Sequence, residues 1–491
     1  MKPNVVIIVV DALRADRAVS EDKRTITPKI NELTTESVCF PNSFTVINST
    51  DPAVTSLHTG RYPLSHGLMN HGMRVTDKEK AIIENVPQLP ELLSEAGYRT
   101  AAFGRPRGRW HKRGFDEHPE YDIRNEPIKN WIGSVLHRIH PSIRDIAATV
   151  HDLTVGRLES KAKTEGGVAQ DFRNFLDGSA PFYAFIHLMD THIPYEPDPD
   201  LVKEYLNRFE YSTQSFNDWT DPASAGIFSQ EFRRRIKDGK YPEIAKKYYY
   251  TDGEPTSAVV DAHYDATVHE ADQRVGRILD ALKERDQLDE TVFIVLADHG
   301  ESLTEHGIYY DHHGLYDESV KIPLIIRPPG GTPDRETVDD FIQITDIAPT
   351  VASYADVDGL NPDGKSLKPV IEGEGEVERE FVMAEETHTQ RRRMIRTEEE
   401  KLIYLVGGDT VCRYCDVQHA PETELYNIAD DPEEKNNLRT SRQERVSELR
   451  EKAEKMAESY KDRSVEVRPD EKVKYEDEEE VQKRLEHLGY K

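Results

Sequence analysis

Asn4–Val10, NVVIIVV, is a continuous run of apolar and mostly β-branched residues. Such a run predicts a strand buried on both faces, as in a parallel sheet that is covered by helices. The run ends at Asp11. Because ligands of open α/β sheets bind beyond the carboxyl ends of the strands, we expect this acidic residue to lie at a functional site.

Further apolar runs predict more strands of the same sheet. They are Tyr98–Phe103, Phe182–Leu188, Thr291–Ala297 and Pro323–Ile326. Between these runs, Val86–Ala96 and Ala258–Leu282 carry apolar residues at helical spacing. Strands that alternate with helices predict an α/β fold with a mostly parallel central sheet between layers of helices.

Changes in composition divide the chain into parts. Residues 1–363 predict a large catalytic α/β domain, and 196–255, rich in charged and aromatic residues, reads as an insertion over its site. Shorter strand-like pieces predict a smaller C-terminal α+β subdomain over 364–440. Residues 441–491 are dominated by Glu, Lys and Arg, which predicts a charged helix followed by a frayed tail.

Composition limits the partners and the compartment. The net charge of −28 argues against nucleic acid, whose phosphates need basic residues, and is typical of proteins from salt-loving organisms. The longest apolar runs fall short of the roughly 20 residues of a membrane span, and the first has no signal-peptide features. We therefore expect a cytoplasmic protein. Cys412 and Cys415 have CxxC spacing, but without a second pair they are expected to be incidental thiols.

A second decisive stretch is Asn48–Gly60, NSTDPAVTSLHTG. Its hydroxyl and carboxylate side chains precede Pro52, which is favoured at the first turn of a helix, and Gly60 can end that helix in a left-handed conformation. A hydroxyl at a helix N-terminus lies where the backbone N–H groups favour an anion. It is either an ordinary helix cap or a nucleophile, and the rest of the chain must decide between them.

The buried strands end in groups that bind metals. Asp11 follows Asn4–Val10, Asp190 and His192 follow Phe182–Leu188, and Asp298 and His299 follow Thr291–Ala297. Carboxylates, an imidazole and a neighbouring hydroxyl at one edge of a sheet suit a divalent cation. Each residue alone has a structural alternative, and their joint occurrence favours the metal site.

Several of these segments, in order, resemble the sulfatase family of the alkaline phosphatase superfamily over roughly residues 3–440. The matching segments are NVVIIVVDALRAD, DPAVTSLHTGRYPLSHG, FYAFIHLMDTHIPY, VFIVLADHGESLTEHG and ELYNIADDPEEKNNL. The resemblance implies an alkaline-phosphatase-like fold and a metal-dependent ester hydrolase.

The chain departs from that family at the nucleophile. Sulfatases carry Cys or Ser, converted to formylglycine, in a C-x-P-S-R motif, whereas this chain has Thr50 at the modified position and Val54 in place of the arginine. Formylglycine is therefore not expected, and the chain is similar here to superfamily branches that use an unmodified threonine. Ala12 also stands where many sulfatases have a second carboxylate.

The resemblance implies roles for individual residues. Asp11, Thr50, Asp298 and His299 would hold one Ca, Mg, Mn or Zn ion, with Thr50 as the nucleophile. His192 and either His312 or His313 would contact the anionic oxygens of the substrate or protonate its leaving group. In a two-metal version, the second ion would be held by Asp190, His192 and His313. The candidates for a displaced basic substrate-binding motif are Arg105, Arg109 and His111.

Four functions follow from these features. We favour hydrolysis of a phosphate diester or monoester, with sulfuric ester hydrolysis without formylglycine as the alternative. A transferase of phosphorylated head groups is disfavoured by the lack of membrane helices, and an inactive binding protein by the retained metal set. The substrate would be a small-molecule or carbohydrate ester. The sequence does not indicate an oligomeric state.

Overall fold

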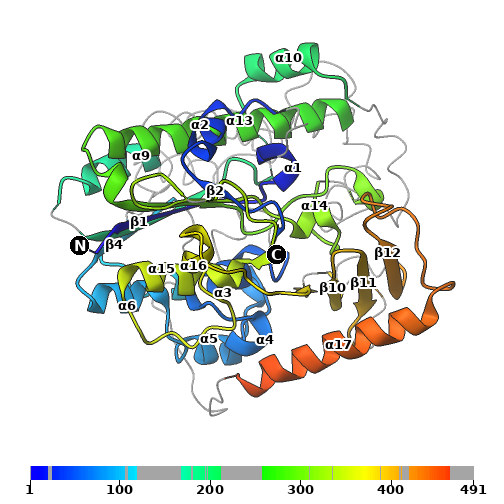
Figure 1. Ribbon diagram of the computed structural model, residues 1–491. Coiled ribbons are helices and arrows are strands. Elements are labelled where there is room, and N and C mark those ends of the chain that lie inside the picture. Colours follow the sequence, from blue (N-terminus) through cyan, green and yellow to red (C-terminus); the bar gives the residue numbers. More distant parts are fainter. Residues whose placement is uncertain are drawn as a thin grey trace, which may run out of the picture.

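A computed structural model describes most of the chain (Figure 1). The described residues are 2–19, 25–104, 109–118, 167–178, 181–211 and 257–464, apart from short breaks at 194, 196, 309, 334, 388, 408–410, 412–417 and 419. Most of the predicted insertion, the end of the tail and both cysteines of the CxxC pair lie outside these residues.

The central sheet has six strands in the order β2-β7-β6-β1-β5-β4. Their bounds are β1 Asn4–Val10, β2 Val38–Cys39, β4 Arg99–Gly104, β5 Phe182–Leu188, β6 Thr291–Leu296 and β7 Leu324–Arg327. Strand β1 lies at the centre, parallel to β5 and β6. Strand β4 is parallel to β5, whereas β7 is antiparallel to β6, so the prediction of a mostly parallel sheet is confirmed. Every residue of β1, β5 and β6 is buried, as the apolar runs predicted.

Helices cover both faces of this sheet (Figure 1). One face carries α2 Pro28–Thr34, α9 Gly167–Phe175 and the long α13 Ser257–Lys283, with α10 Pro199–Arg208 packed outside α13. The other face carries α3 Thr50–Thr59, α6 Leu89–Glu95 and α15 Ile347–Ala355. The expected helix over Val86–Ala96 begins later, because Gln88 caps it and Pro90 occupies its first turn.

Short elements complete the large domain. The helices are α1 Ala15–Ala18, α4 Pro63–His66, α5 Asp77–Ile83, α14 Asp317–Val320 and α16 Lys368–Ile371. The 3₁₀ turns are η1 Gly72–Arg74, η2 Arg109–Lys112, η5 Leu288–Glu290, η6 Glu305–Gly307 and η7 Ile344–Asp346. Two short strands, β3 Ser43–Phe44 and β8 Ile342–Gln343, pair in parallel.

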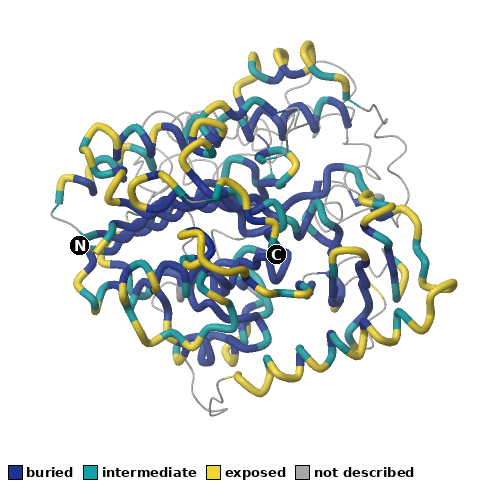
Figure 2. The backbone as a smooth tube through the Cα atoms, viewed as in Figure 1, coloured by how far each residue is buried: buried dark blue, intermediate teal, exposed yellow. Residues whose placement is uncertain are grey.

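The C-terminal part forms a second, antiparallel sheet of β12-β11-β10-β9. Its strands are β9 Val382–Glu386, β10 Arg392–Arg396, β11 Glu400–Leu405 and β12 Thr423–Asn427. The charged segment after it forms α17 Gln443–Asp462, which is mostly exposed but buries Leu449, Ala453 and Ala457 (Figure 2). The helix is therefore held by a narrow apolar stripe.

Strand β9 connects the second sheet to the segment that leads into α3. The Glu385 N–H donates to the Val46 carbonyl at 2.9 Å, and Ile47 forms a β-bridge with Glu385. The Glu385 carboxylate in turn accepts from Arg393 of β10 at 2.6 Å. The second sheet thus supports the backbone just before Thr50.

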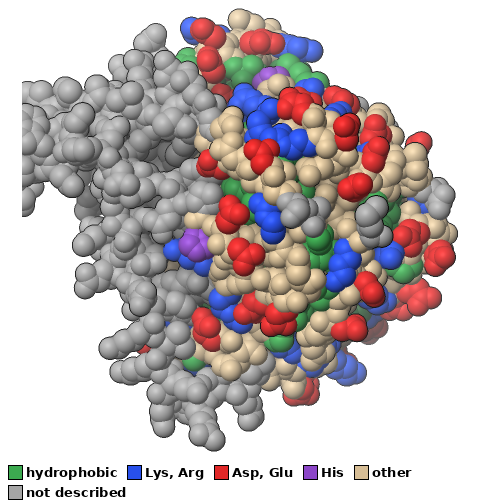
Figure 3. All heavy atoms as spheres, turned by 90° about the vertical axis from the view of Figure 1, so that its left-hand side faces the viewer, with side chains coloured by type: hydrophobic (Ala, Val, Ile, Leu, Met, Phe, Trp, Pro, Cys, Tyr) green, Lys and Arg blue, Asp and Glu red, His purple; other side chains and the backbone are tan. Residues whose placement is uncertain are grey.

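The surface of the described part is strongly charged. On one face, Asp and Glu side chains are interspersed with Lys and Arg (Figure 3). Among the helices described, none combines the length and the apolar character that a membrane crossing requires.

Candidate active site

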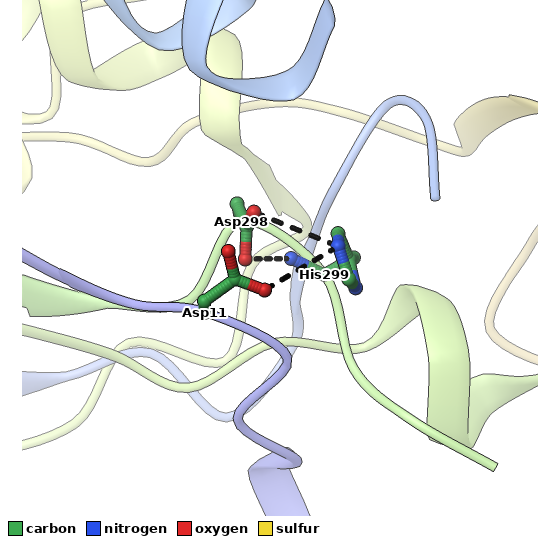
Figure 4. Close-up of side chains that lie close together, drawn as sticks. All are labelled: Asp11, Asp298 and His299. Carbon is green, nitrogen blue, oxygen red and sulfur yellow. Dashed lines mark hydrogen bonds and ion pairs between the residues drawn. The ribbon is translucent and has the colours of Figure 1, made fainter. Parts of the chain in front are cut away.

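Three ligating side chains meet at the carboxyl ends of β1 and β6 (Figure 4). Asp11 follows β1, and Asp298 and His299 follow β6. Each of them offers one ligand atom, and these atoms all lie within 4.8 Å of one another. His299 Nε2 is 3.9 Å from Asp11 Oδ1 and 3.6 Å from Asp298 Oδ2. Parallel neighbouring strands bring these residues together, as their positions at the strand ends predicted.

The buried oxygens of this cluster suit a divalent cation. Asp11 and Asp298 are 1% and 0% exposed, yet Asp11 Oδ1 and Asp298 Oδ2 accept no hydrogen bond from the described residues. Buried carboxylates normally have a partner, so unpartnered oxygens that face one another fit a bound ion. Burial alone raises the pKa of Asp11, but the charge of His192 and a hydrogen bond with His187 hold it well below its usual range.

Ala12 occupies the position of the missing second carboxylate. Its φ of 57° is in the left-handed region, which is rare for alanine. The Ala12 N–H donates to Asp298 Oδ1 at 3.1 Å, and its carbonyl accepts from the Tyr264 hydroxyl at 2.8 Å. This backbone conformation is therefore held at both ends, and one oxygen of Asp298 is oriented by the chain itself.

Thr50 is the first residue of α3, and its hydroxyl faces the metal-ligating cluster. Thr50 Oγ1 lies 3.5 Å from Asp11 Oδ2 and 3.4 Å from His299 Nε2. Ser49 is the N-cap, and no side chain caps this helix, so the hydroxyl of Thr50 has no capping role. Gly60 ends the helix with a φ of 67°, which confirms the predicted left-handed end.

Of the predicted substrate histidines, His312 and His192 lie near this centre. The rings of His312 and His299 are 4.3 Å apart, and His312 Nδ1 is 2.5 Å from the carbonyl oxygen of Asn48. His313 is buried, with Nδ1 3.6 Å from Asp311 Oδ1. His192 Nδ1 is 2.5 Å from the Ile193 carbonyl oxygen, which fixes the orientation of its ring.

The residues of the two-metal version are arranged differently. Asp190 forms an ion pair with Arg274 of α13 at 2.9 Å. Within the described part of the chain, Asp190, His192 and His313 do not form a group with ligand atoms as close as those of the first cluster. Of the basic candidates, Arg105 lies outside the described residues, and Arg109 begins η2.

His111 belongs to a network that the sequence did not reveal. Its Nε2 lies 3.2 Å from Asp51 Oδ1, while Asp51 Oδ2 lies 3.0 Å from His71 Nδ1 and accepts from the Gly72 N–H at 2.7 Å. Burial raises the pKa of Asp51, but His71 and His111 together hold it well below its usual range. The network fixes the residue that follows Thr50 in α3.

His187 also escaped the sequence analysis. It is 1% exposed, and its Nε2 lies 3.1 Å from Asp11 Oδ2. A single histidine in the otherwise apolar strand Phe182–Leu188 was the signal that could have revealed it, since a buried imidazole needs a polar partner.

Comparisons with known proteins place this chain. A model of the sulfatase family matches residues 3–357. The chain belongs to the sulfatase family. A model of the C-terminal region of N-sulphoglucosamine sulphohydrolase matches residues 304–458. The N-acetylglucosamine-6-O-sulfatase of Bacteroides thetaiotaomicron is a relative, 25% identical over 96% of this chain and 88% of its own length.

Solved structures of sulfatases and phosphonate hydrolases share the fold. A structure in complex with its substrate D-glucosamine-2-N,6-O-disulfate has a TM-score of 0.64 at 20% identity, covering 94% of this chain and 99% of its own. The phosphonate monoester hydrolase of Agrobacterium radiobacter has a TM-score of 0.63 at 21% identity, with coverage of 94% and 96%. These structures confirm the predicted fold class, and membership of the sulfatase family, part of the alkaline phosphatase superfamily, indicates a hydrolase.

Proposed function

We propose that this sulfatase-family protein is a metal-dependent hydrolase that attacks a phosphate or sulfate ester with the hydroxyl of Thr50. Asp11, Asp298, His299 and Thr50 would hold one divalent ion. The observation that carries the proposal is the position of the Thr50 hydroxyl, 3.5 Å from Asp11 Oδ2 and 3.4 Å from His299 Nε2. An ion bound there lowers the pKa of the hydroxyl and makes it a stronger nucleophile.

The ligand set favours some metals over others. Two carboxylates, one imidazole and one hydroxyl give few oxygen ligands, whereas Ca²⁺ takes about 6–8 of them. Imidazole suits Zn²⁺ and related transition metals. Among Ca, Mg, Mn and Zn, we therefore favour Mn or Zn.

The side chains around the centre supply the remaining steps. Thr50 Oγ1 releases its proton to solvent and forms a bond to phosphorus or sulfur while the bond to the departing ester oxygen breaks. We assign the proton for that oxygen to His192 Nε2, because Nδ1 of the same ring is engaged with the Ile193 carbonyl. His312, beside His299, and the buried His313 would contact the anionic oxygens. Water then hydrolyses the threonine ester and restores the hydroxyl.

We place phosphate esters ahead of sulfate esters because the chain has a threonine at the position where sulfatases form formylglycine. The fold shared with phosphonate monoester hydrolases is compatible with this order. Sulfuric ester hydrolysis is the second candidate, favoured by the relationship to an N-acetylglucosamine-6-O-sulfatase. Both candidates are compatible with a carbohydrate ester as the substrate.

The test is a substrate panel. Purified protein is assayed on matched aryl phosphate diester, phosphate monoester and sulfate ester substrates with Mn²⁺, Zn²⁺, Mg²⁺ or Ca²⁺. Thr50→Ala and Thr50→Ser variants are assayed beside it, since serine keeps the hydroxyl. We expect diester or monoester turnover with Mn²⁺ or Zn²⁺, lost in the alanine variant and partly kept in the serine variant.

Other results would change the assignment. Turnover of the sulfate ester alone would favour the second candidate. No turnover with any metal would indicate a binding protein. Mass spectrometry of the Thr50 peptide is expected to show an unmodified side chain, and an aldehyde there would overturn the assignment of the nucleophile.

A further inference from the structure

Asp11 is held at three points by strand β5 and the residues that follow it. Its N–H donates to the carbonyl of Leu188 at 2.9 Å, and its own carbonyl accepts from the Thr191 hydroxyl. The third contact is made by the side chain, because Asp11 Oδ2 lies 3.1 Å from His187 Nε2. The first two contacts fix the backbone, and the contact with His187 is shorter than the 3.5 Å contact that the Thr50 hydroxyl makes with the same carboxylate oxygen.

We propose that His187 is a positioning residue that donates from Nε2 to Asp11 Oδ2 and so presents the other oxygen, Oδ1, to the divalent ion. This rests on the proposed function, in which Asp11 is a metal ligand. Asp11 Oδ1 is buried, accepts no hydrogen bond from the described residues, and lies on the side of His299 at 3.9 Å. Neighbours that orient metal ligands in this way typically change metal affinity by about 10–100-fold.

The position of His187 is set by the sheet itself. It lies opposite Val9 of β1 and Gly104 of β4, in the middle of three parallel strands. Gly104 has a φ of +81°, and a Cβ added there would lie 2.0 Å from the carbonyl oxygen of His187. The close approach at Gly104 therefore constrains the backbone of His187.

The substitution at Ala12 makes this orientation more important. The cluster has two carboxylates, Asp11 and Asp298, and the chain already orients Asp298 through the N–H groups of Ala12 and His299 at 3.1 and 3.0 Å. His187 has the corresponding role for Asp11. With no third carboxylate to compensate, a misoriented Asp11 would weaken the site directly.

His58 provides a matched control. It is also a fully buried histidine, on α3, with its ring 4.6 Å from that of Phe185 in β5. Neither of its ring nitrogens forms a hydrogen bond with a described residue, so it does not hold Asp11. Burial and the nearby His111 and His187 lower the pKa of His58 well below its usual range. Its substitution shows how much metal binding changes when a buried imidazole near the site is altered without the loss of a contact to Asp11.

The experiment measures the dissociation constants of Mn²⁺ and Zn²⁺ by calorimetry on the full, metal-free chain. The variants are His187→Gln, His187→Asn and His58→Asn, with Asp298→Asn to identify the site. The amide of glutamine reaches the position of Nε2, whereas that of asparagine stops near Nδ1. We expect His187→Asn to weaken binding about 10–100-fold, His187→Gln to restore most of it, and His58→Asn to leave it within about twofold.

Some results would overturn only the role of His187, and another would overturn the proposed metal site itself. Unchanged affinity in His187→Asn, or an equal loss in His58→Asn, would overturn the role of His187 while a site sensitive to Asp298→Asn survived. Equal weakening in His187→Gln and His187→Asn would also overturn it. If the unaltered chain binds neither metal, the metal site fails, and the role of His187 fails with it.

Discussion

This molecule has two buried clusters of charged side chains, and the carboxylates of the two clusters differ in how they are paired. At the edge of the large sheet, Asp11 and Asp298 form no ion pair with a described lysine or arginine, and one oxygen of each has no hydrogen bond. Between the two sheets, the fully buried Lys401 lies 2.9 Å from both Asp317 and Glu434. In the proposed function the first cluster takes a cation from outside, whereas the second contains its own.

Substitutions in the two clusters should therefore have different effects, on metal binding in the first cluster and on folding stability in the second. Carboxylates without a lysine or arginine partner should repel one another unless an ion is bound, so changes there should alter metal binding and turnover more than folding. Carboxylates paired with a buried lysine depend on it, so changes there should alter folding and leave metal binding intact. The predictions below test this contrast.

The largest effect is expected from Asp298→Asn at the edge of the sheet. The amide keeps an acceptor for the N–H groups of Ala12 and His299 but removes one of two charges from the ligand set. We expect kcat/KM to fall about 10⁴-fold, comparable with the loss of other essential active-site groups. The unfolding midpoint of the metal-free variant should not fall, because a repulsive pair has been relieved. A large loss of stability in the absence of metal would contradict the contrast.

Lys401→Met is the corresponding change between the sheets. It leaves Asp317 and Glu434 buried without their cation, which typically costs about 3–5 kcal/mol of unfolding free energy. Denaturant unfolding measures this cost, and the dissociation constant for Mn²⁺ or Zn²⁺ should stay unchanged. Lys452→Met, which removes an exposed ion pair with Glu380, should cost less than about 1 kcal/mol. Similar losses in the two variants would show that the buried lysine has no special role.

The candidate ligands at the edge of the large sheet could be predicted from the sequence better than the residues that support them. The strands ending at Asp11 and Asp298 were visible because apolar runs depend on local composition, and parallel strands bring their ends together. Pro52 and Gly60 indicated the helix of Thr50, and the resemblance to the sulfatase family implied that its hydroxyl lies near these residues.

The supporting contacts could not be predicted in the same way. Asp51, His71 and His111 are far apart in the chain and meet only through packing, so no local periodicity signals their contact. The contact of His187 with Asp11 depends on the register of β1 and β5, which composition does not specify. The pairing of Lys401 of β11 with Asp317 of α14 depends on packing between distant segments and could not be predicted either.

Asp51→Asn tests the contrast between the two clusters close to the active site. Asp51 follows Thr50 in the chain, yet both oxygens of its carboxylate have partners in the protein. It contacts His71 and His111 and accepts from the Gly72 N–H. We therefore expect the behaviour of the cluster between the sheets, with a loss of about 1.5–3 kcal/mol of unfolding free energy for hydrogen bonds to a charged group. The metal dissociation constant should change by no more than about twofold. Weaker metal binding without a loss of stability would assign Asp51 to the metal site instead.

The smallest effect concerns the charge balance beside Lys401. Burial, followed by the charges of Glu434 and Glu305, raises the pKa of Glu318 to about 8. A carboxyl whose pKa is raised by folding stabilises the folded state below its ordinary pKa of about 4.5, and this contribution is lost as the pH rises through about 8. The glutamine of Glu318→Gln does not titrate, so the variant does not lose this stability as the pH rises. The unfolding free energy of the variant should exceed that of the unaltered chain by a margin that grows as the pH rises from about 5 to about 8. The exposed Glu376→Gln should keep the original pH slope, and an equal slope in Glu318→Gln would mean that the positive charges nearby already balance Glu318.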